Sequence, residues 1–131
     1  MYRKTVATLR RFGLSYQDAR HELGKRSQVT LCNNTTVETG FAVLTGEDAV
    51  VVRLHGHAIY QVASDGRRYV RTCGWNTVTT RSRLNALLAD TPCRVASVKG
   101  EPCLYRTGVR VGNVDSDTWT LVPIHTNESE V

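Results

Sequence analysis

Hydrophobic positions in the first part of the chain recur every three or four residues. This period appears in residues 3–12 and again in residues 15–23, which predicts two short helices. Ser15 stands at the start of the second segment, where a side-chain oxygen commonly caps a helix. Gly24 follows its last apolar residue, where many helices end. We therefore expect an N-terminal helical segment over residues 1–24.

Beyond this segment the pattern changes to short apolar runs separated by turn residues, which is typical of antiparallel strands. The strongest run covers residues 50–62, in which Gly56 indicates a bulge or a kink. An Asp-Gly pair at residues 65–66 is a hairpin turn signal. Residues 67–73 are then expected to return as the partner strand.

A further helix follows, with Thr79 or Thr80 as its N-cap. Three leucines, Leu84, Leu87 and Leu88, lie on one side of this helix and predict its buried face. The remaining strands are expected at residues 94–98 and 103–106, joined by a turn at residues 99–102, and at residues 109–111 and 119–122, which would pair with each other.

These elements predict an α+β fold, a mainly antiparallel sheet of short strands with one to three short helices. A length of 131 residues fits a single domain. Within it we expect the helical segment 1–24, a β-rich domain over residues 25–124 and a disordered tail over residues 125–131.

No apolar run approaches the roughly 18 residues that a membrane span requires. Arg10 and Arg11 interrupt the segment in which a signal peptide would need its apolar core. The sequence therefore predicts a cytoplasmic protein without a membrane partner. In that compartment the scattered cysteines are expected as small buried side chains rather than disulfides; they are Cys32, Cys73, Cys93 and Cys103.

The net charge of +5 is distributed in blocks. Residues 1–26 carry seven basic and two acidic side chains, and residues 67–111 carry nine and two. Residues 27–66 carry one and four, and residues 112–131 carry none and four. If the fold brings the two basic segments together, their field attracts polyanions. If they fold onto opposite faces, that field is lost.

Trp75 begins the stretch with the strongest indication of binding chemistry. An exposed indole could stack on a nucleobase, and a helix N-terminus with arginines could hold a phosphate. In the alternative interpretation Trp75 anchors the core, a threonine only caps the helix and the arginines are solvated. The other candidate binding residues of this stretch are Thr77, Thr80, Arg81, Arg83 and Asn85.

The predicted hairpin strand just before it is rich in arginine. Alternation would place Arg67, Tyr69 and Arg71 on one exposed face, where an aromatic ring stands among cations as on nucleic-acid surfaces. Arg68 points to the other face and is counted with the same basic surface. Charged residues on exposed strands also serve solubility and prevent edge pairing, so both interpretations stay open.

His55 and His57 are the candidate metal ligands. On a regular strand they would face the same side, and Cys73 on the neighbouring strand could complete a site. The alternative is a pair of half-buried histidines satisfied by hydrogen bonds, because the sequence offers no second ligand pair at fixed spacing.

Several short motifs occur in an order that resembles a family of small proteins encoded by tailed bacteriophages. The resemblance extends from Gly24 to about Tyr105 and implies a phage origin and a fold, but no reaction. His57 and Cys73 depart from it, since Thr and Gly are usual there, so features built on them would be peculiar to this chain. The motifs are Gly24-Lys25-Arg26, Asn33-Asn34-Thr35, Arg53-Leu54-His55, the Gly-Trp-x-Thr-x-Thr-Thr segment at 74–80, and Arg83-x-Asn85.

The functional expectation is a non-catalytic phage accessory protein in the host cytoplasm. It would bind nucleic acid or another phosphate-rich partner through its basic face, without a cofactor. Phosphate-binding Gly-rich loops, nucleophile elbows and zinc-protease motifs do not occur in the sequence.

Three alternatives follow from the same residues. A host-takeover or anti-defence factor would bind a host protein through the same blocks of charge. The region from Trp75 to Asn85 could sequester a small nucleotide. A metal-dependent enzyme would use His55 and His57.

Overall fold

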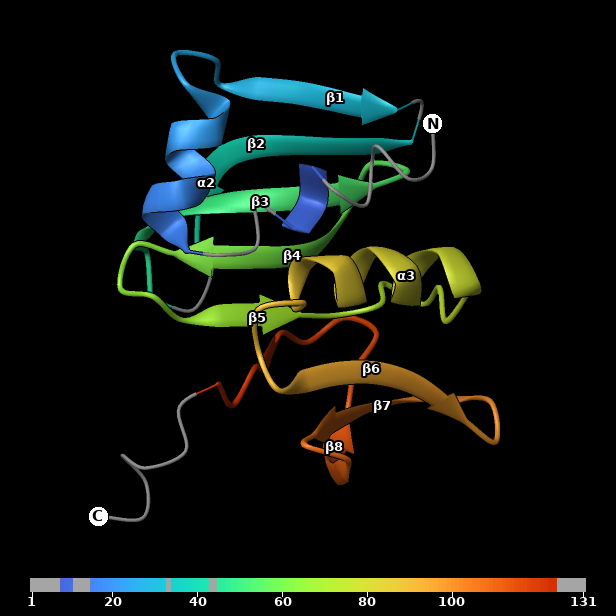
Figure 1. Ribbon diagram of the computed structural model, residues 1–131. Coiled ribbons are helices and arrows are strands. Elements are labelled where there is room, and N and C mark those ends of the chain that lie inside the picture. The colour runs from blue at the N-terminus through green and yellow to red at the C-terminus, as the bar shows by residue number, and fades with distance from the viewer. Residues whose placement is uncertain (1–7, 11–14, 33, 43–44, 125–131) are drawn as a thin grey trace, which may run out of the picture.

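The computed structural model describes residues 8–10, 15–32, 34–42 and 45–124, which form two antiparallel sheets and a layer of helices (Figure 1). The larger sheet has six strands in the order β1-β2-β3-β4-β5-β9, and every neighbouring pair is antiparallel. Strands β1 to β5 follow one another as a meander, so each needs only a short turn. The strands are β1 (Gln28–Cys32), β2 (Thr35–Phe41), β3 (Asp48–Leu54), β4 (His57–Ala63), β5 (Arg68–Val70) and β9 (Thr120–Leu121).

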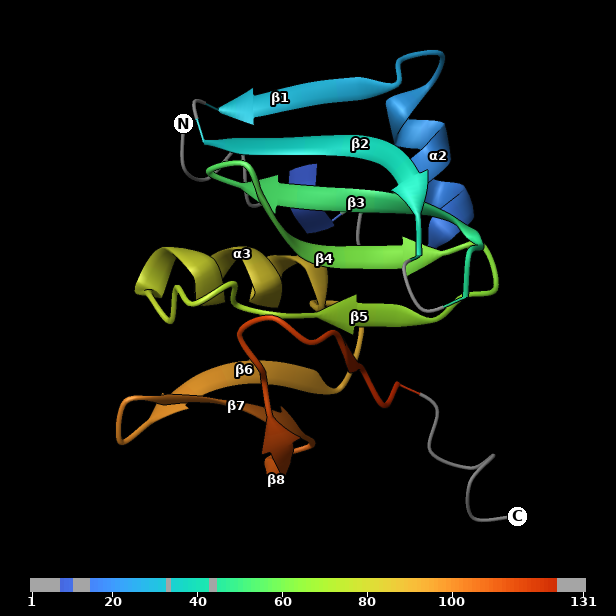
Figure 2. The same ribbon diagram turned by 180° about the vertical axis from the view of Figure 1, so that it is seen from behind.

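Two helices, α2 (Tyr16–Leu23) and α3 (Val78–Leu87), cover one face of this sheet, as the views from both sides show (Figures 1 and 2). The predicted cap of α2 is confirmed, since Ser15 Oγ accepts a hydrogen bond of 3.0 Å from the amide of Asp18. Gly24 ends α2 with a φ of 64°, a conformation that glycine adopts without strain. The expected helix at residues 3–12 is described only at residues 8–10, which are helical.

The smaller sheet has three strands, β6 (Cys93–Val98), β7 (Glu101–Arg106) and β8 (Val109–Asn113). The predicted pairing of residues 109–111 with 119–122 is wrong. Strand β8 pairs with β7, and β9 instead pairs with β5 at the edge of the larger sheet. One two-residue turn, Thr107-Gly108, joins β7 to β8 directly. Pairing across this short turn is favoured over pairing across the longer connection between β8 and β9.

The prediction of one interrupted strand over residues 50–62 is also wrong. His55 and Gly56 form a tight turn between β3 and β4, with φ values of 52° and 80°. Positive φ at both central residues is the geometry of the two-residue hairpin turns that match the twist of a sheet. The bulge that the sequence predicts at Gly56 lies instead within the β3–β4 pair, where the register shifts between Val52 and Arg53.

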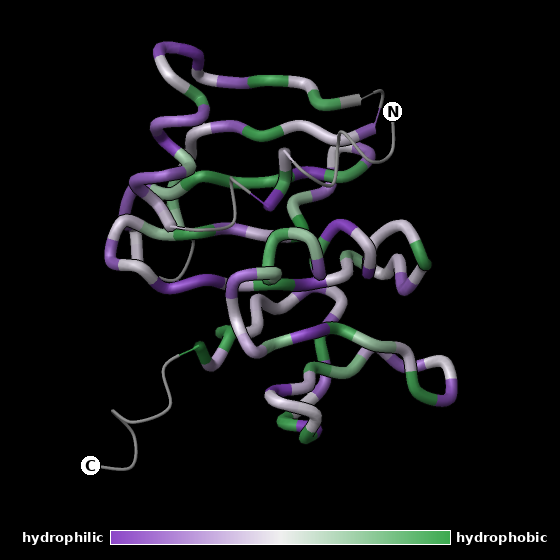
Figure 3. The backbone as a smooth tube through the Cα atoms, viewed as in Figure 1, coloured by the Kyte–Doolittle hydropathy of each residue, from purple (hydrophilic) through white to green (hydrophobic). Residues whose placement is uncertain are grey.

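The main core lies between the larger sheet and the helices. Figure 3 shows hydrophobic residues along β3 and near the end of α3, and hydrophilic residues along most of α2. Leu84, Leu87 and Leu88 are fully buried, which confirms the predicted inner face of the third helix. They pack with Val52 and Tyr60 of the sheet in one continuous cluster.

A second, smaller cluster covers the opposite face of the sheet. The chain crosses this face between β8 and β9 and places Trp119 against Val51, Ala58 and Tyr69 (Figure 2). Both faces of β5 are therefore covered, so side chains on this strand cannot form an exposed surface.

The result is an α+β protein dominated by antiparallel strands. The division into segments 1–24 and 25–124 stays a prediction, and the expected tail at residues 125–131 lies outside the described residues. Neither α2 nor α3, nor any other helical stretch in the described part of the chain, has the length and apolarity of a bilayer-crossing helix.

Candidate functional site

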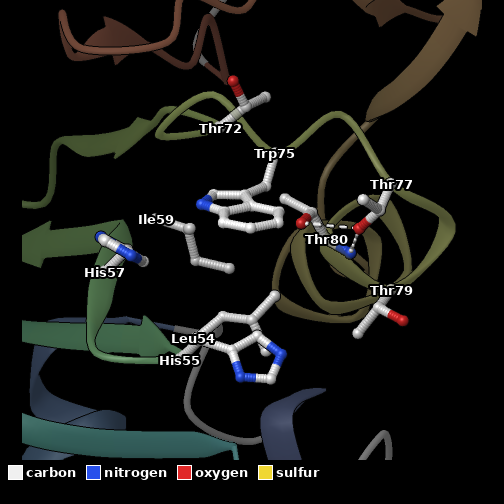
Figure 4. A pocket seen from close by; sticks show the side chains of 9 residues that line it. All are labelled: Leu54, His55, His57, Ile59, Thr72, Trp75, Thr77, Thr79 and Thr80. Carbon is white, nitrogen blue, oxygen red and sulfur yellow. Dashed lines mark hydrogen bonds between the residues drawn. The ribbon is translucent and has the colours of Figure 1, made fainter.

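A pocket of about 480 Å³ lies between the β3–β4 turn and the start of α3. Leu54 and Ile59, at 5% and 1% exposure, provide its apolar floor. The indole of Trp75 forms one wall above Ile59 and is 54% exposed (Figure 4). The remaining lining residues are His55, His57, Thr72, Thr77, Thr79 and Thr80.

A tight turn at Cys73-Gly74 brings Trp75 over the pocket. The φ values of these two residues are 54° and 81°. The amide of Trp75 closes this turn by donating to the carbonyl of Thr72 at 3.0 Å. On the other side of the indole, the amide of Thr77 donates to the carbonyl of Trp75 at 2.9 Å. The backbone is thus fixed on both sides of the indole, while the ring itself stands at the surface.

The start of α3 forms the wall opposite the β3–β4 turn. Its N-cap is Thr77, whose Oγ1 accepts from the amide of Thr80 at 3.1 Å, so the prediction of Thr79 or Thr80 as the cap is wrong. Thr77 has an extended backbone, with φ −111° and ψ 164°, as an N-cap residue requires. The hydroxyl of Thr80, which is fully buried, lies 3.0 Å from that of Thr77.

Two histidines stand at the rim of the pocket. The ring centroids of His57 and Trp75 are 6.4 Å apart, and their planes are inclined by 34°. The indole nitrogen of Trp75 is on the side that faces His57 (Figure 4). None of the nine described residues that line the pocket carries a carboxylate or a guanidinium group. The pocket therefore offers aromatic and aliphatic surface with hydroxyl and imidazole groups at its edge.

The first turn of α3, which the structure describes completely, contains no acidic residue. The first amides of a helix have no partner within it, and together with the helix dipole they favour an anion nearby. The pocket lies beside this helix end, so an anionic group on a ligand would not be repelled by a carboxylate from the first turn of α3.

The expected exposed face of Arg67, Tyr69 and Arg71 is not formed. Strand β5 lies between β4 and β9, and Tyr69 is only 3% exposed because it packs in the cluster around Trp119. Arg67 does reach solvent, with 59% of its side chain exposed, and stands 3.8 Å from a carboxylate oxygen of Asp65.

Arg68 belongs to the interior. Its Nη1 and Nη2 donate to the two carboxylate oxygens of Asp90 at 2.8 and 2.7 Å, and only 6% of its side chain is exposed. Burial is the largest single influence and opposes the charge of Arg68, but the hydrogen bonds and charges of Asp90 and Tyr60 together outweigh it, so the pKa of Arg68 is raised overall. Burial also raises the pKa of the neighbouring Tyr60 phenol, which is completely enclosed.

Arg71 and Arg81 donate mainly to the backbone. Arg71 Nε donates to the carbonyl of Ala58 at 2.7 Å, and its guanidinium carbon lies 4.2 Å from the ring centroid of Trp119. Arg81 Nη1 donates to the carbonyl and the side-chain oxygen of Asn76 at 3.2 and 2.6 Å. These bonds leave the positive charge in place but occupy part of the donors that a phosphate clamp would use.

Arg83 and Asn85 face the protein rather than a ligand. Arg83 is 5% exposed, and its Nε donates to Thr35 Oγ1 at 3.2 Å. Asn85 accepts from the amide of Val95 at 2.7 Å and donates to its carbonyl at 3.0 Å, which fastens α3 to β6. Of the predicted binding residues, the structure therefore brings together Trp75, Thr77 and Thr80 at the pocket and places the others elsewhere.

The alternation expected of His55 and His57 is lost because His55 sits in the hairpin turn. Cys73 Sγ lies 3.1 Å from the carbonyl of Ala58 and donates to it. Within the described ranges no three side chains of the types His, Cys, Asp and Glu are grouped as a metal site would require. The three cysteines with described side chains, Cys73, Cys93 and Cys103, are free thiols.

Sequence reasoning missed the floor of the pocket, Leu54 and Ile59, because both were assigned to a single strand. The signal that could have found them was His55-Gly56, since a residue-glycine pair between two apolar runs indicates a two-residue hairpin. That turn would have placed Leu54 and His57 next to each other at the end of the sheet.

The fold and the pocket together define a small antiparallel α+β protein with one aromatic-walled pocket at the end of its sheet. The chain belongs to the Kyanoviridae Gp96 protein family of tailed cyanophages, whose model matches residues 17–120. The match contains every lining residue of the pocket, and it confirms the phage origin that the sequence motifs predict. No curated protein and no solved structure matches the chain.

Proposed function

We propose that this phage protein is a binding protein that takes up one nucleotide unit at the Trp75 pocket. The unit is a free nucleotide or an unpaired nucleotide of a nucleic-acid strand. In either case the base lies against the indole of Trp75 and the phosphate stays outside, towards the start of α3.

The observation that carries the proposal is a half-exposed indole that forms the wall of a pocket with a buried aliphatic floor. A volume of about 480 Å³ falls within the usual range of small-molecule sites. Exposed tryptophan is costly to hydrate, and base stacking on an aromatic ring contributes about 1–3 kcal/mol. A flat ring that covers Trp75 and Ile59 would recover this surface from water.

Electrostatics support an anionic ligand more than a neutral one. The chain has a net charge of +5, and the described lining residues contain no carboxylate that would repel a phosphate. Because most arginines of residues 67–83 donate to the protein itself, attraction comes from the general field rather than from a basic face. Binding of a strand should therefore weaken with salt, with a small slope that reflects few direct phosphate contacts.

Fluorescence of Trp75 tests the proposal directly. The chain has two tryptophans, and Trp119→Phe leaves Trp75 as the only indole. The four deoxynucleoside monophosphates and short single-stranded oligonucleotides are titrated into this variant at low salt. Saturable quenching and a raised melting temperature are expected, since a ligand that binds only the folded state stabilises it.

Trp75→Ala should abolish the rise in melting temperature, while Trp119→Phe alone should keep it. Comparison of monophosphates with oligonucleotides distinguishes a free nucleotide from a strand as the ligand. If neither changes the emission or the melting temperature of a folded protein at low salt, the protein does not bind nucleotides.

A second candidate function is docking on a host protein. Val78, at the start of α3, is 74% exposed and stands in the sequence between the lining residues Thr77 and Thr79, so it adds an exposed apolar side chain to that of Trp75. Exposed aromatic residues beside a pocket are frequent anchors of protein interfaces. A nuclease-treated host lysate should then yield one protein that the wild type retains and that Trp75→Ala and Val78→Ser lose. Retention unaffected by these two changes would count against this function.

A further inference from the structure

Asn76, the residue after Trp75, connects the pocket loop to two other elements. Its Nδ2 donates to Ser97 Oγ at 3.1 Å and to the carbonyl of Gly100 at 3.0 Å, both in the β6–β7 hairpin. Its Oδ1 accepts from Arg81 Nη1 of α3 at 2.6 Å. One side chain therefore joins the loop, the helix and the smaller sheet.

The smaller sheet contributes none of the described residues that line the pocket. Among the described residues, the side chain of Asn76 connects the pocket loop to the smaller sheet through two hydrogen bonds. Gly100, which accepts one of them, has a φ of 81° and forms the hairpin turn with Lys99 at 52°. The position of the accepting carbonyl is thus set by a tight turn rather than by a flexible loop.

The residue before Trp75 offers the indole no side-chain support. Gly74, directly before Trp75, has a φ of 81° and no side chain to pack against the ring. The backbone bonds of Trp75 to Thr72 and Thr77 fix the chain but not the ring. The amides of Thr72 and Cys73 hold the start of the loop by donating to residues 115 and 116. The side chain of Asn76 adds a contact on the other side of the indole, which can limit how the loop tilts over Ile59.

We propose that Asn76 is a positioning residue, which holds the Trp75 wall over the pocket through its bonds to the β6–β7 hairpin. This inference rests on the proposed function for its ligand, a nucleotide, but not for its effect on the indole. The hairpin thereby determines affinity at a pocket that it does not touch.

The test compares three variants. Asn76→Ala removes all side-chain contacts, and Asn76→Asp keeps the acceptor for Arg81 but loses the donor to Ser97 and Gly100. Asn85→Ala is the matched control, because Asn85 also fastens α3 to the smaller sheet by two hydrogen bonds but lies away from Trp75. All three are measured at equal intervals below their own melting temperatures.

Two readouts are needed. Fluorine NMR of protein labelled with 5-fluorotryptophan reports the mobility of each indole without ligand, and titration with deoxynucleoside monophosphates gives affinity. Asn76→Ala and Asn76→Asp should both broaden or shift the Trp75 resonance and weaken binding about tenfold, as expected from two lost hydrogen bonds. Asn85→Ala should lower the melting temperature and leave both readouts unchanged.

Wild-type behaviour of Asn76→Asp in both readouts would overturn the role of the hairpin, since that variant lacks the donor to Ser97 and Gly100. Equal effects of Asn76→Ala and Asn85→Ala would show general destabilisation instead of positioning. If the wild type binds no nucleotide, the proposed function fails by itself, and the resonance of Trp75 in the ligand-free variants still decides whether Asn76 positions the ring.

Discussion

Arg68 and Asp90 form a two-pronged ion pair that joins β5 to the segment after α3, with donor–acceptor distances of 2.8 and 2.7 Å. The pair lies against the buried phenol of Tyr60, whose pKa is raised by burial although the nearby Arg68 acts to lower it. An arginine that the sequence placed on a ligand-binding surface thus serves to hold the helix layer to the sheet.

Removal of Asp90 should be strongly destabilising. Asp90→Ala would leave the charge of Arg68 in the interior, and breaking such a pair costs about 3 kcal/mol. The side chain of Asp90 is 26% exposed, so water can partly solvate Arg68 in its absence. The loss of stability should therefore not exceed this value by much. Urea unfolding followed by circular dichroism measures this change in free energy.

Arg67→Ala is the control for that measurement. Arg67 is the neighbouring arginine, but its contact with Asp65 is exposed and 3.8 Å long. Exposed pairs contribute about 0–1 kcal/mol, so little change is expected. Equal losses for Asp90→Ala and Arg67→Ala would contradict the structural role of the buried pair.

Stability should fall at alkaline pH because of Tyr60. Burial raises the pKa of Tyr60 in the folded protein, whereas the pKa of a tyrosine in an unfolded chain is about 10. The stabilisation is complete below that pH. Above it the unfolded state loses a proton that the folded state retains, so the free energy of unfolding decreases by up to about 1.4 kcal/mol per pH unit.

Tyr60→Phe removes the ionisable phenol. The free energy of unfolding of this variant should therefore fall less steeply with pH above about 10, even if the variant is less stable at every pH. Urea midpoints between pH 8 and pH 11 give the slope by the same approximate relation. An unchanged slope would mean that Tyr60 ionises equally in both states.

A turn substitution should stabilise the protein. Thr107 precedes Gly108 in the β7–β8 hairpin and has a φ of 51°, a region that β-branched residues rarely adopt. Asparagine is favoured at this turn position, so Thr107→Asn should add about 1 kcal/mol. Thr107→Val, which keeps the branched Cβ, should give no gain. The two variants are compared by thermal unfolding, and equal melting temperatures would refute the explanation by backbone strain.

Thiol reactivity should differ between the described cysteines. Burial raises the pKa of the Cys93 thiol, which disfavours its reactive thiolate, and Cys103 is also fully buried. Cys73 is partly exposed and should react first with iodoacetamide under native conditions. Peptide mapping by mass spectrometry measures the order, and labelling of Cys93 as fast as Cys73 would show that its surroundings open readily.

Much of the local structure was predictable because it depends on local chemistry. The cap at Ser15, the helix end at Gly24 and the hairpin at residues 65–66 each follow from a side chain or backbone preference within a few residues. The longer runs were harder. Residues 50–62 have the composition of one strand, and only the turn at His55 and Gly56 divides them into two.

The candidate site was predictable in part. The sequence drew attention to Trp75 through its neighbourhood of threonines and arginines, and its exposure is confirmed. The predicted exposed face of arginines is not formed, because Arg68 and Arg83 are buried and Arg71 packs on Trp119. Those outcomes depend on elements far away in the chain, which periodicity cannot place.

The sequence by itself indicated α2, α3 and several of the strands and turns, since these follow from side-chain period and from residues that favour caps or positive φ. It also determined a net charge of +5. Only the tertiary structure decided that β9 covers the edge of β5, that Asp90 meets Arg68 and that Ile59 lies beneath Trp75. The reason is physical: whether a guanidinium or an indole faces water depends on the strands and helices packed around it, and those come from distant parts of the chain.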